Sequence, residues 1–130
     1  MAFCSEMYYS VDIVFFKNIL AVKCAYRQVK ALLQQEHFAF LHCHSPIGGV
    51  IGRLAGHACG VKVMYTAHGF HFFKGASVVN WMLFYPIERK LAKYTDVLLT
   101  MNAEDTKHAE VFGAGAETFE VLDNTDIVFP

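Results

Sequence analysis

The apolar stretch "VMYTA" is followed by His68, Gly69 and, after one phenylalanine, His71. A histidine at the end of a strand can donate a hydrogen bond to a ligand, or act as an acid or base near neutral pH. Gly69 permits a tight turn that a residue with a side chain resists. These residue types suit a binding or catalytic site, and His68 is its sharpest candidate.

Three phenylalanines and a lysine complete this stretch: Phe70, Phe72, Phe73 and Lys74. The aromatic rings can form the wall of a sugar or lipid site, or they can simply cover a sheet. Lys74 can reach a phosphate as a point charge, although lysines in exposed loops are commonly solvated. The residues alone leave both alternatives open.

A second pair of histidines, His42 and His44, lies two residues apart in "FAFLHCH". On a strand this spacing puts both rings on one face. A zinc ion would need two further ligands, for which only His68 and His71 are available, with no acid near either segment. We therefore expect no metal and no cofactor. The alternative interpretation is that one histidine is hydrogen-bonded in the core while the other lines a cleft.

The residues that follow, "SPIGG" from Ser45, are typical of the start of a helix after a strand, with Ser45 as the N-cap and Pro46 in the first turn. Free N–H groups at such a point attract anions. The stretch is neither a dinucleotide-binding glycine motif nor a phosphate loop with its lysine. Close packing of a glycine-rich helix on a sheet explains Gly48, Gly49, Gly52 and Gly56 equally well.

These motifs fit an alternation of strands and helices along the chain. A short apolar segment predicts a buried strand at 38–44, β-branched and aromatic residues predict a second strand at 61–67, and a third is expected at 96–101. Helical periodicity and capping residues predict helices at 18–35, at 45–60 with Gly60 as C-cap, at 78–94, and after Asn102. Up to two short strands are expected in the tail. The result is an α/β fold with a parallel sheet, whose strand ends bring His44, His68 and Asn102 to one edge.

Three details of the helices can be tested. In the first helix, Ile19, Val22, Tyr26, Val29 and Leu33 share one apolar face, and Asn18 can cap its start. Pro86 should kink or split the helix that Ser77 caps. The segment "VVNWMLFY" within that helix is a core segment or one that lies on a membrane surface, and its shortness favours the core.

Composition narrows the class of protein. The 130 residues are 55% hydrophobic and 18% charged, with a formal net charge of -1, so neither disorder nor a nucleic-acid partner is expected. Cys4, Cys24, Cys43 and Cys59 form no C-x-x-C pair, which favours a reducing, cytoplasmic setting. The N-terminus lacks a signal peptide, and no apolar stretch is long enough to cross a bilayer.

The segments "HCHSPIGGVIGRLA", "YTAHGFHFFKGA" and "NWMLFYPIERKLAKYTDVLLTMNAED", in this order and spacing, resemble the amino-terminal domain of bacterial family-four glycosyltransferases. The resemblance covers about residues 12–105 and points to enzymes of capsular and exopolysaccharide assembly. It implies a Rossmann-like domain, the acceptor-side half of a GT-B fold, and sugar transfer with retention and without a metal. The implied substrates are a nucleotide-sugar and a lipid-linked or glycan acceptor.

By this resemblance, His68 is the histidine that reaches the transferred sugar, holds a hydroxyl and stabilises the oxocarbenium-like transition state without acting as a nucleophile. The glycine turn aims His68 into the cleft, and the aromatic run shapes the acceptor side. The other residues expected to bind substrate are Gly69, His71, Lys74, His44, Ser45 and Asn102.

The chain also departs from the family pattern. It begins after the family's first strand and glycine-rich loop, its tail beyond Asp105 is unfamiliar, and the carboxy-terminal nucleotide-sugar domain is absent. We therefore expect residues 1–130 to form a single, incomplete Rossmann-like domain: a fragment, a frameshifted remnant, or one part of a split enzyme that needs a donor-domain polypeptide. The alternatives are a non-catalytic module that binds a glycan or a protein, and a product without function. A peripheral contact with the inner face of the cell membrane is compatible with the enzyme.

Overall fold

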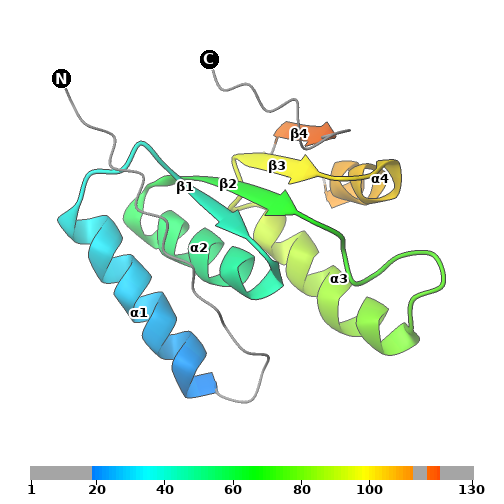
Figure 1. Ribbon diagram of the computed structural model, residues 1–130, viewed down its shortest axis with the longest axis horizontal. Helices are drawn as coiled ribbons and strands as arrows, with labels where there is room; N and C mark the ends of the chain where they lie inside the picture. The colour runs from blue at the N-terminus through cyan, green and yellow to red at the C-terminus, as the bar shows by residue number, and fades with distance from the viewer. Residues whose placement is uncertain (1–18, 113–116, 121–130) are drawn as a thin grey trace.

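The computed structural model describes residues 19–112 and, for the backbone alone, 117–120. Helices and strands alternate along this part of the chain (Figure 1). In order they are α1 (Ile19–Gln35), β1 (Phe40–His44), α2 (Pro46–Cys59), β2 (Lys62–Ala67), α3 (Val78–Ala92), β3 (Val97–Thr100), α4 (Ala103–Phe112) and β4 (Glu117–Glu120). The expected α/β class is confirmed. The Asn18 cap and the rest of the tail lie outside the described residues.

The four described strands form one parallel sheet in the order β1-β2-β3-β4. His44 is in register with Thr66, and Ala67 with Thr100, so the carboxyl ends of these strands share one edge of the sheet. The expectation that β1 is buried is wrong, because β1 is an edge strand of the described sheet. Only Cys43 is buried in β1, while Phe40 and His44 are exposed.

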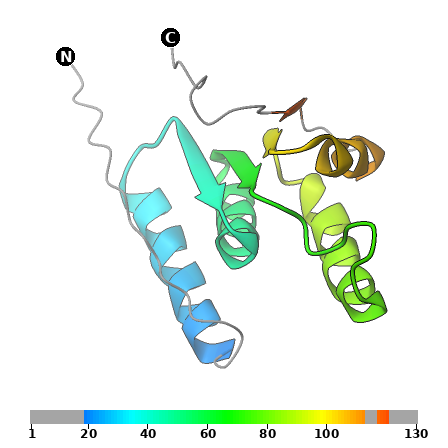
Figure 2. The same ribbon diagram turned by 45° about the vertical axis from the view of Figure 1, so that its right-hand side comes forward.

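Helices α2 and α3 lie on the same side of the sheet, and α1 packs against α2 (Figures 1 and 2). The predicted apolar face of α1 is confirmed from Val22 to Leu33, but Ile19 at its first turn is exposed. The core lies between the sheet and the helices. Val63, Tyr65 and Leu98 of the sheet meet Ala92 of α3 and Phe112 of α4 there.

Local sequence explains where α2 begins and ends. Ser45 caps its start by accepting a hydrogen bond from the Gly48 amide, and Pro46 occupies its first turn. Gly60 ends it in the left-handed conformation at φ 69°. All three expectations are confirmed.

Helix α3 begins after the Ser77 cap and continues through Pro86 as one element. The expectation that proline splits this helix is therefore wrong. Proline cannot donate to the backbone carbonyl of Met82, but Met82 lies on the solvent side of α3, where water can satisfy that carbonyl. The helix can thus accept Pro86 at its surface.

Candidate functional site

The carboxyl edge of the sheet places the predicted histidines side by side. His44 is the last residue of β1, and His68 directly follows β2, its neighbour in the sheet. Nδ1 of His44 lies 3.0 Å from Nε2 of His68, and their rings stack with centroids 5.3 Å apart. Both side chains are exposed to solvent. The convergence expected from the strand order is confirmed for this pair.

The His44–His68 hydrogen bond requires at least one neutral ring. One facing nitrogen must donate and the other accept, so the hydrogen bond cannot survive if both imidazoles are fully protonated. Partial burial, followed by the nearby charge of His68, lowers the pKa of His44. The pair can therefore hold a neutral acceptor nitrogen at physiological pH while the outward edges of both rings face solvent.

His42 supports the pair from within the sheet. Its ring lies 4.2 Å from that of His44, centroid to centroid, and its Nε2 lies 2.8 Å from Oγ1 of Thr66. Burial, with smaller contributions from His44 and His68, lowers the pKa of His42 to about 4. His42 is thus a neutral, hydrogen-bonded histidine, while His44 and His68 meet at the edge. Of the two histidines in β1, His42 is therefore the one hydrogen-bonded within the sheet, whereas a cleft beside His44 stays a prediction.

The backbone at both strand ends is unusual. Gly69 has φ 155°, and Ser45, which is not glycine, has φ 64°. The Oγ of Ser45 accepts from the Gly48 amide at 3.3 Å, so this hydroxyl is engaged in starting α2. Farther along, a side chain at Gly49 would collide with the ring of Tyr65, and one at Gly52 with Sγ of Cys43. Close helix–sheet packing therefore explains these two glycines.

The aromatic residues after Gly69 point mainly into the protein. Phe70 and Phe72 are buried and stack with centroids 4.7 Å apart, and Phe70 meets the ring of Phe112 edge-on. His71 packs edge-on against Phe84 of α3, with 4.5 Å between the ring centroids. The expectation that the whole aromatic run shapes an acceptor site is therefore wrong, because Phe70 and Phe72 cover the core. Only Phe73 of the three phenylalanines is exposed.

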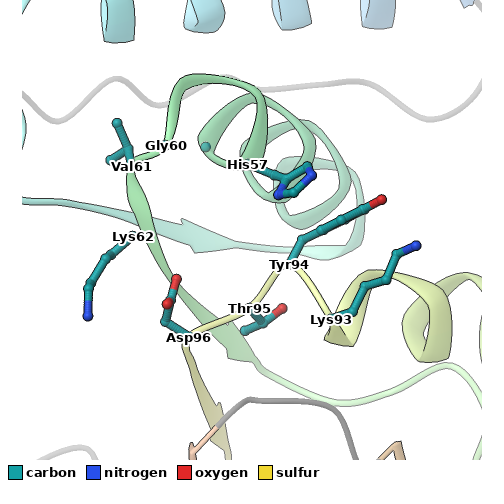
Figure 3. Close-up of a pocket in the computed structure, with 9 residues that line it drawn as sticks. His57, Gly60, Val61, Lys62, Lys93, Tyr94, Thr95 and Asp96 are labelled. Carbon is teal, nitrogen blue, oxygen red and sulfur yellow. The ribbon is translucent and has the colours of Figure 1, made fainter.

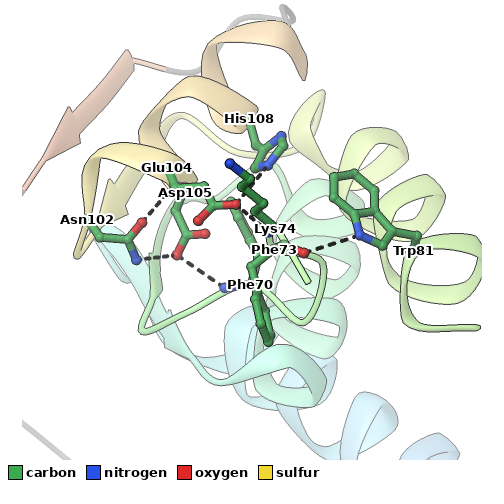
Figure 4. Close-up of polar contacts among 8 residues, drawn as sticks. All are labelled: Phe70, Phe73, Lys74, Trp81, Asn102, Glu104, Asp105 and His108. Carbon is green, nitrogen blue, oxygen red and sulfur yellow. Dashed lines mark hydrogen bonds and ion pairs between the residues drawn. The ribbon is translucent and has the colours of Figure 1, made fainter. Parts of the chain in front are cut away.

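The loop after His68 is held by the first turn of α4 (Figure 4). Oδ2 of Asp105 accepts from the Phe70 amide at 3.2 Å, and Oε1 of Glu104 accepts from the Lys74 amide at 2.6 Å. Asn102 caps α4 by accepting from the Asp105 amide and also donates to Asp105 Oδ2. Asn102 thus positions Asp105, whereas the Lys74 side chain stays exposed.

These contacts identify supporting residues that the sequence motifs missed. Glu104 and Asp105 are acids in the first turn of a helix, a pattern that the helix dipole already explains. Because that helix begins beside the end of β2, its two carboxylates also accept hydrogen bonds from amides of the loop. The sequence could have indicated this role, because the helix that follows β3 must begin at the edge of the sheet where β2 ends.

A separate hollow lies at the opposite edge of the sheet (Figure 3). It is lined by residues near the start of β2 and the end of α3, including Gly60, Asp96 and the stacked rings of His57 and Tyr94. The hollow shares no residue with the histidine pair. Within the described residues, no three histidine, cysteine or acidic side chains are grouped to hold a metal ion.

Residues 9–125 match a family described as "Glycosyl transferase 4-like domain". The chain belongs to this glycosyltransferase family. The match confirms the family expected from the motifs, and the parallel sheet with its helices corresponds to part of a Rossmann-like glycosyltransferase domain. In the described part of this domain, no helix is both long and apolar enough to cross a membrane.

Two curated relatives resemble this glycosyltransferase domain. Over 83 residues it is 52% identical to "Putative glycosyltransferase EpsD" of Bacillus subtilis (strain 168), covering 62% of the chain and 22% of the relative. Over 75 residues it is 33% identical to "UDP-Gal:alpha-D-GlcNAc-diphosphoundecaprenol alpha-1,3-galactosyltransferase" of Escherichia coli, covering 57% and 19%. The alignment spans about a fifth of the length of each relative.

Proposed function

We propose that this chain forms the acceptor side of a glycosyltransferase that moves a sugar from a nucleotide-sugar to a lipid-linked or glycan acceptor in surface polysaccharide biosynthesis. The observation that carries this proposal is the exposed His44–His68 pair at the carboxyl edge of a sheet that belongs to this family. Open α/β sheets bind their ligands at that edge. The name of the Escherichia coli relative supports a sugar acceptor attached to a lipid diphosphate.

The proposed role of His68 is to hold the transferred sugar. Transfer breaks the bond between the anomeric carbon and the nucleotide's phosphate oxygen, and forms a bond from that carbon to an acceptor oxygen. The acceptor hydroxyl proton leaves with the departing phosphate. His44 fixes the orientation of His68 through the 3.0 Å hydrogen bond, so His68 can present its other ring nitrogen to a sugar hydroxyl. Neither histidine forms a covalent bond, in keeping with the retaining chemistry that the resemblance implies.

The donor nucleotide-sugar is proposed to bind a second domain outside these 130 residues, as in a GT-B enzyme. The loop from His68 to Lys74 would then border the cleft between the domains. The proposed substrate contacts are Gly69, Ser45 and the exposed side chain of Lys74. Asn102 would act through Asp105, and His71 is a further candidate, whose ring packs against Phe84. The proposed setting is the cytoplasmic side of the cell membrane, with no resident cofactor.

A segment exchange tests this function with a defined reaction. The matching 75-residue segment of the Escherichia coli galactosyltransferase is replaced by that of this chain, and transfer of labelled galactose from UDP-galactose to the diphosphoundecaprenol-linked acceptor is measured. We expect transfer by the chimera, and a loss of about 100-fold on His68→Ala. His57→Ala, at the opposite edge of the sheet, is the matched control and should retain activity.

Two results would contradict the proposal. One is a chimera that folds, as judged by circular dichroism, yet transfers no galactose. The other is an active chimera in which His68→Ala and His57→Ala have equal effects. A folded but inactive chimera that still binds the acceptor glycan would favour the non-catalytic binding module.

A further inference from the structure

One face of α3 is open to solvent and is divided into an apolar half and a cationic half. Its first two turns expose Val78, Val79, Met82 and Leu83, with exposed fractions of 72%, 70%, 74% and 45%. Arg89 and Lys90 are exposed in the last turn. At 3.6 residues per turn, these six side chains fall within an arc of about 140°. We call these six residues the α3 face.

The rest of α3 is already packed. Trp81, Phe84 and Tyr85 contact the core from the opposite side of the helix, and Glu88 is buried against Arg53 of α2. The expectation that "VVNWMLFY" is a core segment is therefore correct for only half of its residues. Because α3 does not need the α3 face for its attachment to the domain, the exposed apolar residues call for another explanation.

The loop before α3 extends the apolar half. Phe73 is exposed and lies beside the first turns of α3, where its carbonyl accepts from Nε1 of Trp81 at 3.3 Å (Figure 4). Lys74 follows it and is also exposed. An aromatic ring and a lysine thus lie at the edge of the apolar half, and the tethers from α4 hold them there.

Both charged side chains of the α3 face are cationic. The only acid of α3 is Glu88, which the ion pair with Arg53 buries, so Arg89, Lys90 and Lys74 are not offset by an acid on the helix. The carboxylate of Glu104 in α4 accepts from the Lys74 amide, and its Oε1 lies 4.0 Å from Nε2 of His108.

We propose that the α3 face, together with Phe73 and Lys74, docks on a phospholipid surface that carries anionic headgroups. A 15-residue helix of about 22 Å can lie in the interface, its apolar side chains among the upper acyl chains and its cations at the phosphates. Helices that connect parallel strands run opposite to them, so α3 begins on the side of the sheet where β2 ends (Figure 1). His68 directly follows β2. If the proposed function holds, docking brings the histidine pair to the surface from which a lipid-linked acceptor extends.

Vesicle flotation with the purified full chain tests this surface without any sugar donor or acceptor. Vesicles of phosphatidylcholine with 30% phosphatidylglycerol are compared with vesicles of phosphatidylcholine alone. We expect binding to the anionic vesicles that weakens as salt is raised. Val79→Glu/Met82→Glu should lower the bound-to-free ratio at least tenfold, and Arg89→Glu/Lys90→Glu should abolish the preference for phosphatidylglycerol. The matched controls are Val111→Glu and Lys107→Glu on the exposed side of α4, which should bind like the unaltered chain.

Three outcomes would overturn the proposal: no binding of the folded chain to anionic vesicles, equal losses in the α4 controls, or concentration-dependent dimers that the α3 variants abolish while vesicle binding stays absent. The last would assign the α3 face to a second copy of the chain. The assay contains no sugar donor or acceptor. A failure to bind vesicles would therefore contradict the proposed docking surface but not the proposed sugar transfer.

Discussion

Arg53 of α2 donates from Nη1 to Oε2 of Glu88 of α3 across 2.7 Å, and the two side chains are only 1% and 7% exposed. The Nε of Arg53 also donates to the Gly49 carbonyl at 2.8 Å, and its guanidinium lies 4.1 Å from the centroid of the Tyr65 ring. The hydroxyl of Tyr65 lies 3.5 Å from the other Glu88 oxygen. One buried ion pair thus joins two helices to the middle of β2.

Breaking this ion pair should destabilise the domain strongly. Arg53→Met leaves the Glu88 carboxylate buried without its partner, which typically costs about 3–5 kcal/mol. The double variant Arg53→Met/Glu88→Leu removes both charges and should recover most of that loss, since buried pairs replaced by apolar side chains are often neutral. Urea unfolding of the unaltered chain, Arg53→Met, Glu88→Leu and the double variant measures the coupling. Additive losses in the double variant would show that the two residues act independently.

A methyl group at Gly52 should also destabilise the domain. A Cβ there would collide with Sγ of Cys43, so the cysteine side chain, α2 or β1 must shift. The expected loss from overpacking is about 1–3 kcal/mol, which outweighs the gain of roughly 1 kcal/mol in helix propensity. Thermal unfolding of Gly52→Ala measures the net effect. Cys43→Ala in the same chain removes the obstructing sulfur and should reverse the loss, and a double variant as unstable as Gly52→Ala would contradict this explanation.

The features that were predictable from the sequence are those that local chemistry decides. Ser45, Pro46 and Gly60 define α2 through hydrogen bonds and backbone angles within a few residues, and Asn102 caps α4 in the same way. The end-to-end order of strands and helices then brings His44 and His68 to one edge. This part of the candidate site needed only the rule that parallel strands end together.

Tertiary neighbours decide what the sequence could not show. Arg53 and Glu88 are 35 residues apart, and neither lies in a pattern that names its partner. Whether the aromatic residues after Gly69 face a ligand or the core depends on where α4 lies, because the ring of Phe112 in α4 packs edge-on against Phe70. The division of α3 into packed and exposed apolar residues likewise depends on the direction from which the sheet approaches it.

Acid should weaken the fold through His42. Its folded pKa of about 4 is below the ordinary value of 6.5, so between these pH values the unfolded chain binds more protons than the folded one. The free energy of unfolding should therefore fall as pH drops from 6.5 to 4, with a slope from His42 below the roughly 1.4 kcal/mol per pH unit of one whole proton. His44, whose pKa is also lowered, acts in the same direction. His42→Gln can keep a hydrogen bond to Thr66 without titrating, so urea unfolding at a series of pH values should show a flatter dependence; an unchanged slope would exclude His42 as the source.

Asp105 should control the order of the loop that carries His68. Its side chain is 2% exposed and accepts from the Phe70 amide, so Asp105→Ala leaves a buried donor unpaired at a cost of about 1–3 kcal/mol. We expect faster hydrogen exchange at Phe70 and a shifted imidazole signal for His68 by nuclear magnetic resonance. Asp105→Asn keeps an acceptor oxygen and should restore part of the protection, whereas Glu104→Ala should mainly affect the Lys74 amide. If Phe70 exchanges at the same rate in Asp105→Ala as in the unaltered chain, the loop is held by its buried rings alone, and Asp105 has no positioning role.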